Sequence, residues 1–289
     1  MPRKKKTTNP IRKRKVACYG SCIRPKYWSE LWTNFTENND IEFEMIMVGH
    51  ISPDFEPPKN MHHVFSKEKP SACVEIARRI AHASDCKYML NFTDDYYRLS
   101  DNFLDKLVED IEDAEKDGID NYITCAVFRV SPDDPWDKHD TPLIYHNRHP
   151  ESPQLHTWMF HKTETSIKWG SIDKMFMGQY WDVDLQMRNY QNGGFGGQQK
   201  AVEMTERRPE NDALGPRCAQ IQPNDRQLLD GVWDPVVTGK RDNKNRYHYP
   251  GGSPAPTKRR KEVVPYTDED LNYLKDNNLS SWKDFWKKK

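Results

Sequence analysis

The fold is decided by residues 72–95, which read ACVEIARRIAHASDCKYMLNFTDD. In the first half, residues 72–83, apolar side chains recur at helical spacing. The second half contains a short apolar run at residues 88–92, typical of a buried strand, and Asp94 and Asp95 follow it almost at once. This stretch therefore predicts a helix, a strand and a pair of carboxylates at the carboxyl end of that strand.

The same alternation continues on both sides of this stretch. Apolar runs typical of strands occupy residues 16–19, 43–48, 61–65, 122–130 and 156–161, and helical spacing occurs at residues 26–35, 101–114 and 183–190. Strands that alternate with helices imply an α/β fold with a largely parallel sheet and helices on both faces. In such sheets ligands bind beyond the carboxyl ends of the strands, so we expect a functional site at Asp94 and Asp95.

Two adjacent aspartates also have a simpler interpretation. Aspartate is favoured in solvated turns and at helix N-caps, so the pair taken alone indicates a turn as strongly as a metal site. Its position after a buried strand favours the metal site, because two carboxylates that face one direction can hold a hard divalent cation through oxygen.

A second motif, Trp181-Asp182-Val183-Asp184-Leu185, lies downstream. Residues 88–96 and 170–188 together resemble the D-x-D strand and the "G-x-F-D-E-x-F … G-x-E-D-V-D-L-x-x-R" segment of glycosyltransferases with the GT-A fold, in particular family 2 and its relatives, viral and phage enzymes among them. The resemblance covers roughly residues 15–195. It implies a GT-A fold, which is a Rossmann-like, mixed and mostly parallel sheet flanked by helices, here followed by an irregular C-terminal extension.

The resemblance assigns roles to three aspartates. Asp95 would be the metal-binding carboxylate, Asp94 would contact the metal or the nucleotide ribose, and Asp182 matches the catalytic base. The chain departs from the family pattern at Thr93, where many relatives carry another acid, and at Trp181, where the family usually has glutamate.

Four further residues are matched to the ligands by position. Tyr19 and Arg24 lie at the first strand end, where the family holds the nucleotide base. Arg188 matches either a contact to the nucleotide or a structural ion-pair partner. His248 lies where some relatives place a histidine on the metal, and its alternative interpretation is an ordinary loop histidine.

The activity implied by the resemblance is sugar transfer. The donor would be a nucleoside diphosphate sugar, a UDP-sugar above all, and the acceptor a hydroxyl of a glycan, a lipid-linked sugar or modified DNA. A Mn²⁺ or Mg²⁺ ion would neutralise the leaving diphosphate. If the anomeric centre is inverted, Asp182 would take the proton of the attacking hydroxyl.

Charge is balanced over the whole chain and concentrated locally. Lys plus Arg and Asp plus Glu number 44 each, so no global field draws the protein to nucleic acid or to an anionic membrane. Residues 1–14 are expected to form a basic disordered tail, and residues 258–261 are a second basic cluster. These two segments favour an alternative function, nucleic-acid binding or DNA modification. A further alternative is a catalytically silent GT-A module used for binding.

The remaining predictions concern organisation and compartment. The glycosyltransferase domain is expected over residues 15–250, and a linker with a C-terminal amphipathic helix over residues 251–289. The six cysteines include no C-x-x-C pair, and no apolar run reaches the ~20 residues that span a bilayer. We therefore expect a soluble, reduced, cytoplasmic protein.

Overall fold

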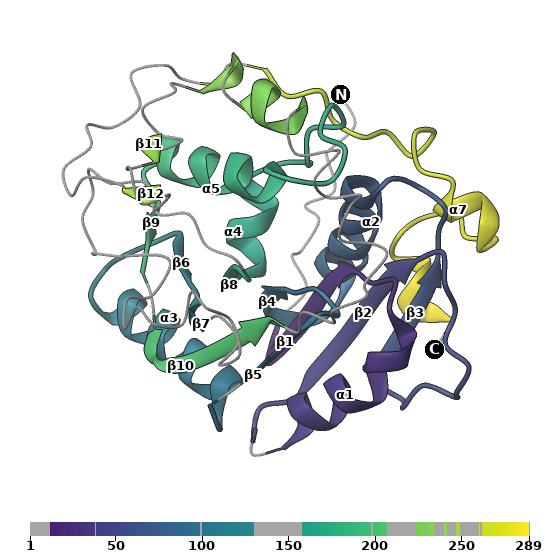
Figure 1. Ribbon diagram of the computed structural model, residues 1–289, viewed down its shortest axis with the longest axis horizontal. Helices are drawn as coiled ribbons and strands as arrows, with labels where there is room; N and C mark the ends of the chain where they lie inside the picture. The colour runs from purple at the N-terminus through teal and green to yellow at the C-terminus, as the bar shows by residue number, and fades with distance from the viewer. Residues whose placement is uncertain are drawn as a thin grey trace, which may run out of the picture.

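A computed structural model describes residues 12–37, 39–98, 100–129, 158–197, 199–206, 224–229, 231–233, 240–241, 247–248, 260 and 262–288 of the chain. Its centre is a seven-stranded sheet of order β3-β2-β1-β4-β8-β6-β9 (Figure 1). The strands are β1 (Lys13–Ser21), β2 (Phe43–Gly49), β3 (Met61–Phe65), β4 (Cys86–Asn91), β6 (Tyr122–Thr124), β8 (Phe160–Lys162) and β9 (Phe195–Gly196). Strands β3, β2, β1 and β4 are parallel, whereas β8 runs antiparallel to β4 and β6. The predicted α/β fold with a mixed, mostly parallel sheet is confirmed.

The first strand begins earlier than the sequence predicted. β1 starts at Lys13, so the boundary of the expected tail at residue 14 is too late. Arg12 is also anchored, because its guanidinium donates to Glu164 Oε1 at 2.7 Å and to the backbone oxygens of Ser84 and His82 at 2.8 and 3.0 Å. Residues 1–11 of the predicted tail lie outside the described residues.

Helices cover both faces of the sheet. Helix α2 (Pro70–Ala83) packs on one face, and α1 (Trp28–Thr36) and α3 (Phe103–Lys116) pack on the other. Alternate residues of β1 therefore join two different clusters, both of them buried. A strand that is buried on both faces needs apolar residues at every position, which explains its continuous apolar run.

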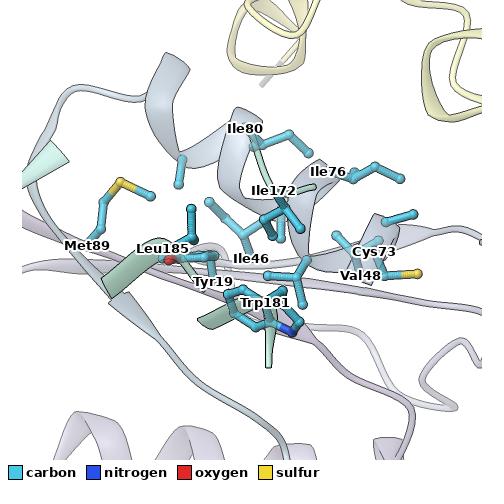
Figure 2. Close-up of a cluster of buried hydrophobic side chains, with 14 of the residues drawn as sticks. Tyr19, Ile46, Val48, Cys73, Ile76, Ile80, Met89, Ile172, Trp181 and Leu185 are labelled. Carbon is cyan, nitrogen blue, oxygen red and sulfur yellow. The ribbon is translucent and has the colours of Figure 1, made fainter. Parts of the chain in front are cut away.

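Helix α5 (Trp181–Gln191) joins the same side of the sheet as α2. Figure 2 shows Trp181 and Leu185 of α5 in one cluster with Ile76 of α2 and Ile46 of β2. Trp181 is only 7% exposed. Trp181, one of the two positions at which the sequence differs from the resembled pattern, is therefore a core residue in the first turn of α5.

Two glycines allow the strand ends to come close together. A Cβ added to Gly20 on β1 would lie 2.0 Å from the backbone oxygen of Phe92, and one added to Gly49 on β2 would lie 2.0 Å from that of Cys22. No side chain can be accommodated at these distances. At Gly20 and Gly49 the backbone at the carboxyl ends of β1 and β2 therefore lies directly against the neighbouring backbone.

Smaller elements complete the described structure. The expected strand over residues 122–130 is divided at Cys125 into β6 and β7 (Ala126–Arg129), and β7 belongs to a second sheet of order β5-β10-β7 with β5 (Tyr96–Arg98) and β10 (Gln199–Glu206). β11 (Lys240–Arg241) pairs with β12 (Tyr247–His248). The 3₁₀ helix η1 (Pro25–Tyr27), helix α4 (Thr163–Lys168) and a helical turn at residues 224–229 make up the rest.

The C-terminal segment differs from its prediction. Instead of one amphipathic helix, it forms two short ones, α7 (Tyr273–Asp276) and α8 (Asp284–Lys287), and Asn278 between them adopts a positive φ of 50°. Figure 1 shows this segment running beside α2 and β3. Trp286 donates to the backbone oxygen of Ile80 at 2.9 Å. Phe285 and Trp286 also contact His62 of β3, so tertiary contacts with α2 and β3 hold this segment in place.

None of the helices in the described ranges has the length and hydrophobicity that crossing a membrane would require. The five cysteines in the same ranges are free and buried.

Candidate active site

The two aspartates after β4 lie in a turn at the carboxyl end of the sheet, as the sequence predicted. Asp94 is 2% exposed, and its carboxylate is held from within the protein. Its Oδ2 accepts the backbone N–H of Arg24 at 2.5 Å and the indole N–H of Trp28 at 2.9 Å, and its Oδ1 accepts Nη1 of Arg24 at 3.3 Å. Burial raises the pKa of Asp94, and the hydrogen bonds from Trp28 and Arg24 oppose that change. Asp94 thus joins the loops that follow β1 and β4.

Asp95 differs from Asp94 because one of its carboxylate oxygens has no hydrogen-bond partner among the described residues. Its Oδ2 lies 3.2 Å from the same Nη1 of Arg24. Its Oδ1 is buried, and neither this atom nor the adjacent buried hydroxyl of Thr93 has a hydrogen-bond partner among the described residues. A buried polar atom without a partner costs free energy unless a ligand, ion or water satisfies it. Asp95 Oδ1 therefore fits a cation ligand, whereas the oxygens of Asp94 already have partners.

The protein itself supplies few ligands for a metal. Among the residues that the structure describes, no three His, Cys, Asp or Glu side chains are grouped so that they could hold an ion. Mg²⁺ in nucleotide enzymes is commonly bound by one or two carboxylates, with phosphate oxygens and water as the other ligands. Asp95 next to Asp94 is compatible with that kind of site. His248 lies in β12, and its role as a metal ligand stays a prediction.

Tyr19 does not lie where the sequence predicted. Its side chain is fully buried in the cluster under α2 (Figure 2), and its hydroxyl is 3.5 Å from Nε2 of His161. Burial raises the pKa of Tyr19 above its ordinary value, and the nearby negative charges of Glu75 and Asp182 add to that increase. The prediction that Tyr19 contacts the nucleotide base is therefore wrong, because the pleat of β1 turns this side chain into the core.

Asp182 lies in the first turn of α5, half-buried, close enough to Tyr19 for its charge to be felt there. Burial raises the pKa of Asp182 from 3.8 to about 6, and hydrogen bonds from backbone N–H groups of the helix start limit the increase. A carboxylate with a pKa near 6 is mostly ionised at neutral pH and yet basic enough to accept a proton in a reaction. Such a pKa is compatible with a general base, and the catalytic role of Asp182 stays a prediction.

The loop that leads into α5 is fixed by a residue that the sequence analysis missed. Asp225, 1% exposed, accepts the backbone N–H groups of Met177, Gly178 and Gln179 at distances of 2.8 to 3.1 Å. Tyr180, the next residue, has a positive φ of 58°. Nothing in the sequence near Asp225 signals this role, because its three partners are almost fifty residues away.

We expect Asp225→Ala to lower the free energy of unfolding by about 3 kcal/mol, because three backbone donors lose a charged acceptor. It should also lower kcat by roughly tenfold or more, since the loop that positions Asp182 is loosened. Urea unfolding and steady-state kinetics would measure the two effects. Asp225→Asn keeps one acceptor oxygen, so its stability and kcat should lie between those of wild type and Asp225→Ala. Wild-type stability in the alanine variant would contradict this role.

Arg188 has a structural role in the described residues. Its guanidinium donates to the backbone oxygens of Trp169 and Ser171 at 2.7 and 2.8 Å and to Asp184 Oδ2 at 2.8 Å. Arg188 was predicted either to contact the nucleotide or to be a structural ion-pair partner, and the structure shows the ion pair. A contact to the nucleotide stays a prediction.

Of the second basic cluster, residues 258–261, only Arg260 lies within the described residues, and it is buried. Arg260, whose side chain is 4% exposed, forms ion pairs with both Asp173 and Asp184. Near the N-terminus, Arg14 is paired with Glu112 at 3.2 Å. Arg260 is therefore not available to bind phosphates, which weakens the argument for nucleic-acid binding at that end of the chain.

Comparison with known proteins gives limited information. No family model matches the sequence, and no curated protein matches it. Among solved structures, the chain is similar to S. aureus TarS 1-349, with 13% identity over 67% of this chain and 60% of that one and a TM-score of 0.49. For the same fragment in complex with UDP, the identity is 12% over 66% of this chain and 60% of that one, with a TM-score of 0.49. For S. aureus TarS, the identity is 12% over 67% of this chain and 37% of that one, with a TM-score of 0.47. The chain thus spans about 60% of the length of the matched fragment. Similarity at this level decides neither the fold nor the function.

Proposed function

We propose that this chain is a divalent-metal-dependent glycosyltransferase that moves a sugar from a nucleoside diphosphate sugar to a hydroxyl acceptor. One observation carries the proposal. Two acidic groups of different chemistry support it: Asp95 after β4, with a buried oxygen that lacks a partner among the described residues, and Asp182, whose burial raises its pKa to about 6 and whose charge acts on Tyr19 of β1. Inverting sugar transfer uses both, a site for the leaving diphosphate and a base for the incoming hydroxyl.

The donor half of the proposed site consists of Asp94, Asp95 and Arg24. Asp94 orients the turn, and Asp95 would hold a Mn²⁺ or Mg²⁺ ion through Oδ1. When bound, such an ion neutralises charge on the leaving diphosphate. The ordinary chemistry of these ions agrees with the donor set, because both prefer oxygen ligands.

The acceptor half is Asp182. Its carboxylate would accept the proton of the acceptor hydroxyl as that oxygen attacks the anomeric carbon and the bond to the diphosphate breaks. General-base catalysis of this kind contributes about 10²–10⁴-fold to a rate. A single displacement of this kind inverts the anomeric centre. Glycans, lipid-linked sugars and modified DNA are the acceptor classes to be compared, with UDP-sugars the first donors.

The test is ligand-induced stabilisation of the native state. In a panel of nucleotides and nucleotide sugars with and without Mn²⁺, at least one UDP-sugar should raise the melting temperature by about 5 °C at a concentration of about 100 times its Kd. Asp95→Asn should lose the part of this increase that depends on Mn²⁺. Asp113→Asn, a change at an exposed aspartate of α3, is the matched control and should behave like wild type. The proposal fails if no nucleotide stabilises the wild-type protein.

A further inference from the structure

Arg24 occupies the space between the two carboxylates of the donor site. A single nitrogen, Nη1, lies 3.3 Å from Asp94 Oδ1 and 3.2 Å from Asp95 Oδ2. The Arg24 side chain is 14% exposed, so this contact is largely shielded from solvent. The predicted contact between Arg24 and the nucleotide base stays a prediction, and in the structure this side chain has two anionic partners, Asp94 and Asp95.

We propose that Arg24 is the built-in cation of the Asp94–Asp95 pair, that it leaves Asp95 when a divalent metal binds there, and that it then pairs with the diphosphate of the donor. Arg24 would thus couple metal binding to nucleotide binding. This inference rests on the proposed function.

Electrostatics explains why Arg24 and a metal compete. A divalent ion on Asp95 Oδ1 would lie within a few ångströms of the Arg24 guanidinium, which contacts the other oxygen of the same carboxylate. Repulsion between a double and a single positive charge at such a distance is strong when solvent is largely excluded. Two cations and two carboxylates also leave a net positive charge. A diphosphate would remove both problems, because it supplies negative charge to each cation.

The remaining contacts of Asp94 permit Arg24 to move. Asp94 Oδ2 is held by the backbone N–H of Arg24 and by the indole of Trp28, neither of which depends on the guanidinium. The turn would therefore keep its anchor when the guanidinium leaves. Arginine is well suited to pair with the diphosphate, because its planar fork binds phosphate oxygens in pairs.

The inference is tested by Mn²⁺ binding without any catalytic assay. Free Mn²⁺ is titrated by electron paramagnetic resonance against the full chain, alone and with saturating UDP. For Arg24→Met without UDP we expect Mn²⁺ to bind about tenfold more tightly than to wild type, because the competing charge is gone. With UDP the difference should disappear or reverse, and UDP itself should bind about tenfold more weakly.

Two further variants complete the design. Arg14→Met removes an exposed arginine at the opposite end of β1 and should match wild type in every titration. Arg24→Lys keeps the charge but loses the fork, so we expect Mn²⁺ affinity without UDP within threefold of wild type and UDP affinity clearly reduced. If Arg24→Met does not fold, the lysine variant still decides, because unchanged UDP affinity would overturn the inference.

The inference is also overturned if Arg24→Met binds Mn²⁺ without UDP no more tightly than wild type. The two proposals can fail separately. If wild type binds Mn²⁺ but no nucleotide, the proposed function fails. The competition between Mn²⁺ and Arg24 can still be measured from the Mn²⁺ titrations without UDP. If neither wild type nor Arg24→Met binds Mn²⁺, both fail.

Discussion

Asp182→Asn is expected to lower kcat by about 10²–10⁴-fold and, at neutral pH, to raise the melting temperature. The loss of rate follows from the loss of the general base, since asparagine cannot accept the proton of the acceptor hydroxyl. The gain in stability follows from the burial that raises the pKa of Asp182 from 3.8 to about 6. Burying a charge is unfavourable, and asparagine has the same shape without the charge.

The burial of Asp182 makes the stability of the protein depend on pH. The pKa of Asp182 is higher in the folded state, so the native protein favours the protonated form. The stability that this preference gives is complete below pH 4 and is lost as the pH rises through about 6. At pH 7 the ionised group costs on the order of 2 kcal/mol, allowing for its partial exposure to solvent. Asp182→Asn should therefore be more stable than wild type at pH 8 and nearly equal at pH 4.

Activity should rise with pH over the range in which the contribution of Asp182 to stability falls. The kcat/KM of wild type should rise as the pH increases through about 6, because only the ionised carboxylate is a base. Thermal unfolding at pH 4 and pH 8, together with a pH–rate profile, would measure both effects. Asp113→Asn again serves as the control. A stable Asp182→Asn protein with more than a tenth of wild-type activity would show that Asp182 is not the base.

Asp184→Ala is expected to cause the largest loss of stability, about 3–5 kcal/mol. Asp184 is fully buried, and it accepts Arg188 at 2.8 Å and the indole of Trp233 at 2.9 Å while also pairing with Arg260. Removing the carboxylate leaves two buried guanidinium groups short of an anion. The free energy of unfolding in urea would measure this loss.

A double variant separates lost charge pairing from lost packing. Asp184→Leu combined with Arg188→Met removes both members of one ion pair, replaces them with apolar side chains, and leaves Arg260 its other carboxylate, Asp173. This pair of changes should restore part of the stability that Asp184→Ala loses, because one of the unpaired cations is gone. If Asp184→Ala loses less than about 1 kcal/mol, the network around Arg260 does not stabilise this end of the chain.

The sequence by itself determined the sheet and the positions of the acidic motifs. Local spacing encodes which segments are buried, so residues 72–95 were enough to predict α2, β4 and the two aspartates after them. The expected helix over residues 183–190 corresponds to α5, but α5 begins at Trp181, so Asp182 lies in its first turn instead of before it. Local spacing failed in the C-terminal segment, where Phe285 and Trp286 make tertiary contacts with β3 and α2.

Only the tertiary structure decided the partners of these residues. β1 is buried on both faces, so its apolar run could not reveal which of the two clusters Tyr19 joins. Arg24 and Asp94 are 70 residues apart in the chain, and Arg260 and Asp184 are 76 apart. Ion pairs and backbone clamps form between whichever groups the packed elements bring together, and periodicity within one segment carries no information about them. The position of Asp94 and Asp95 at a strand end could therefore be predicted from the sequence, whereas the Arg24 side chain between them could not.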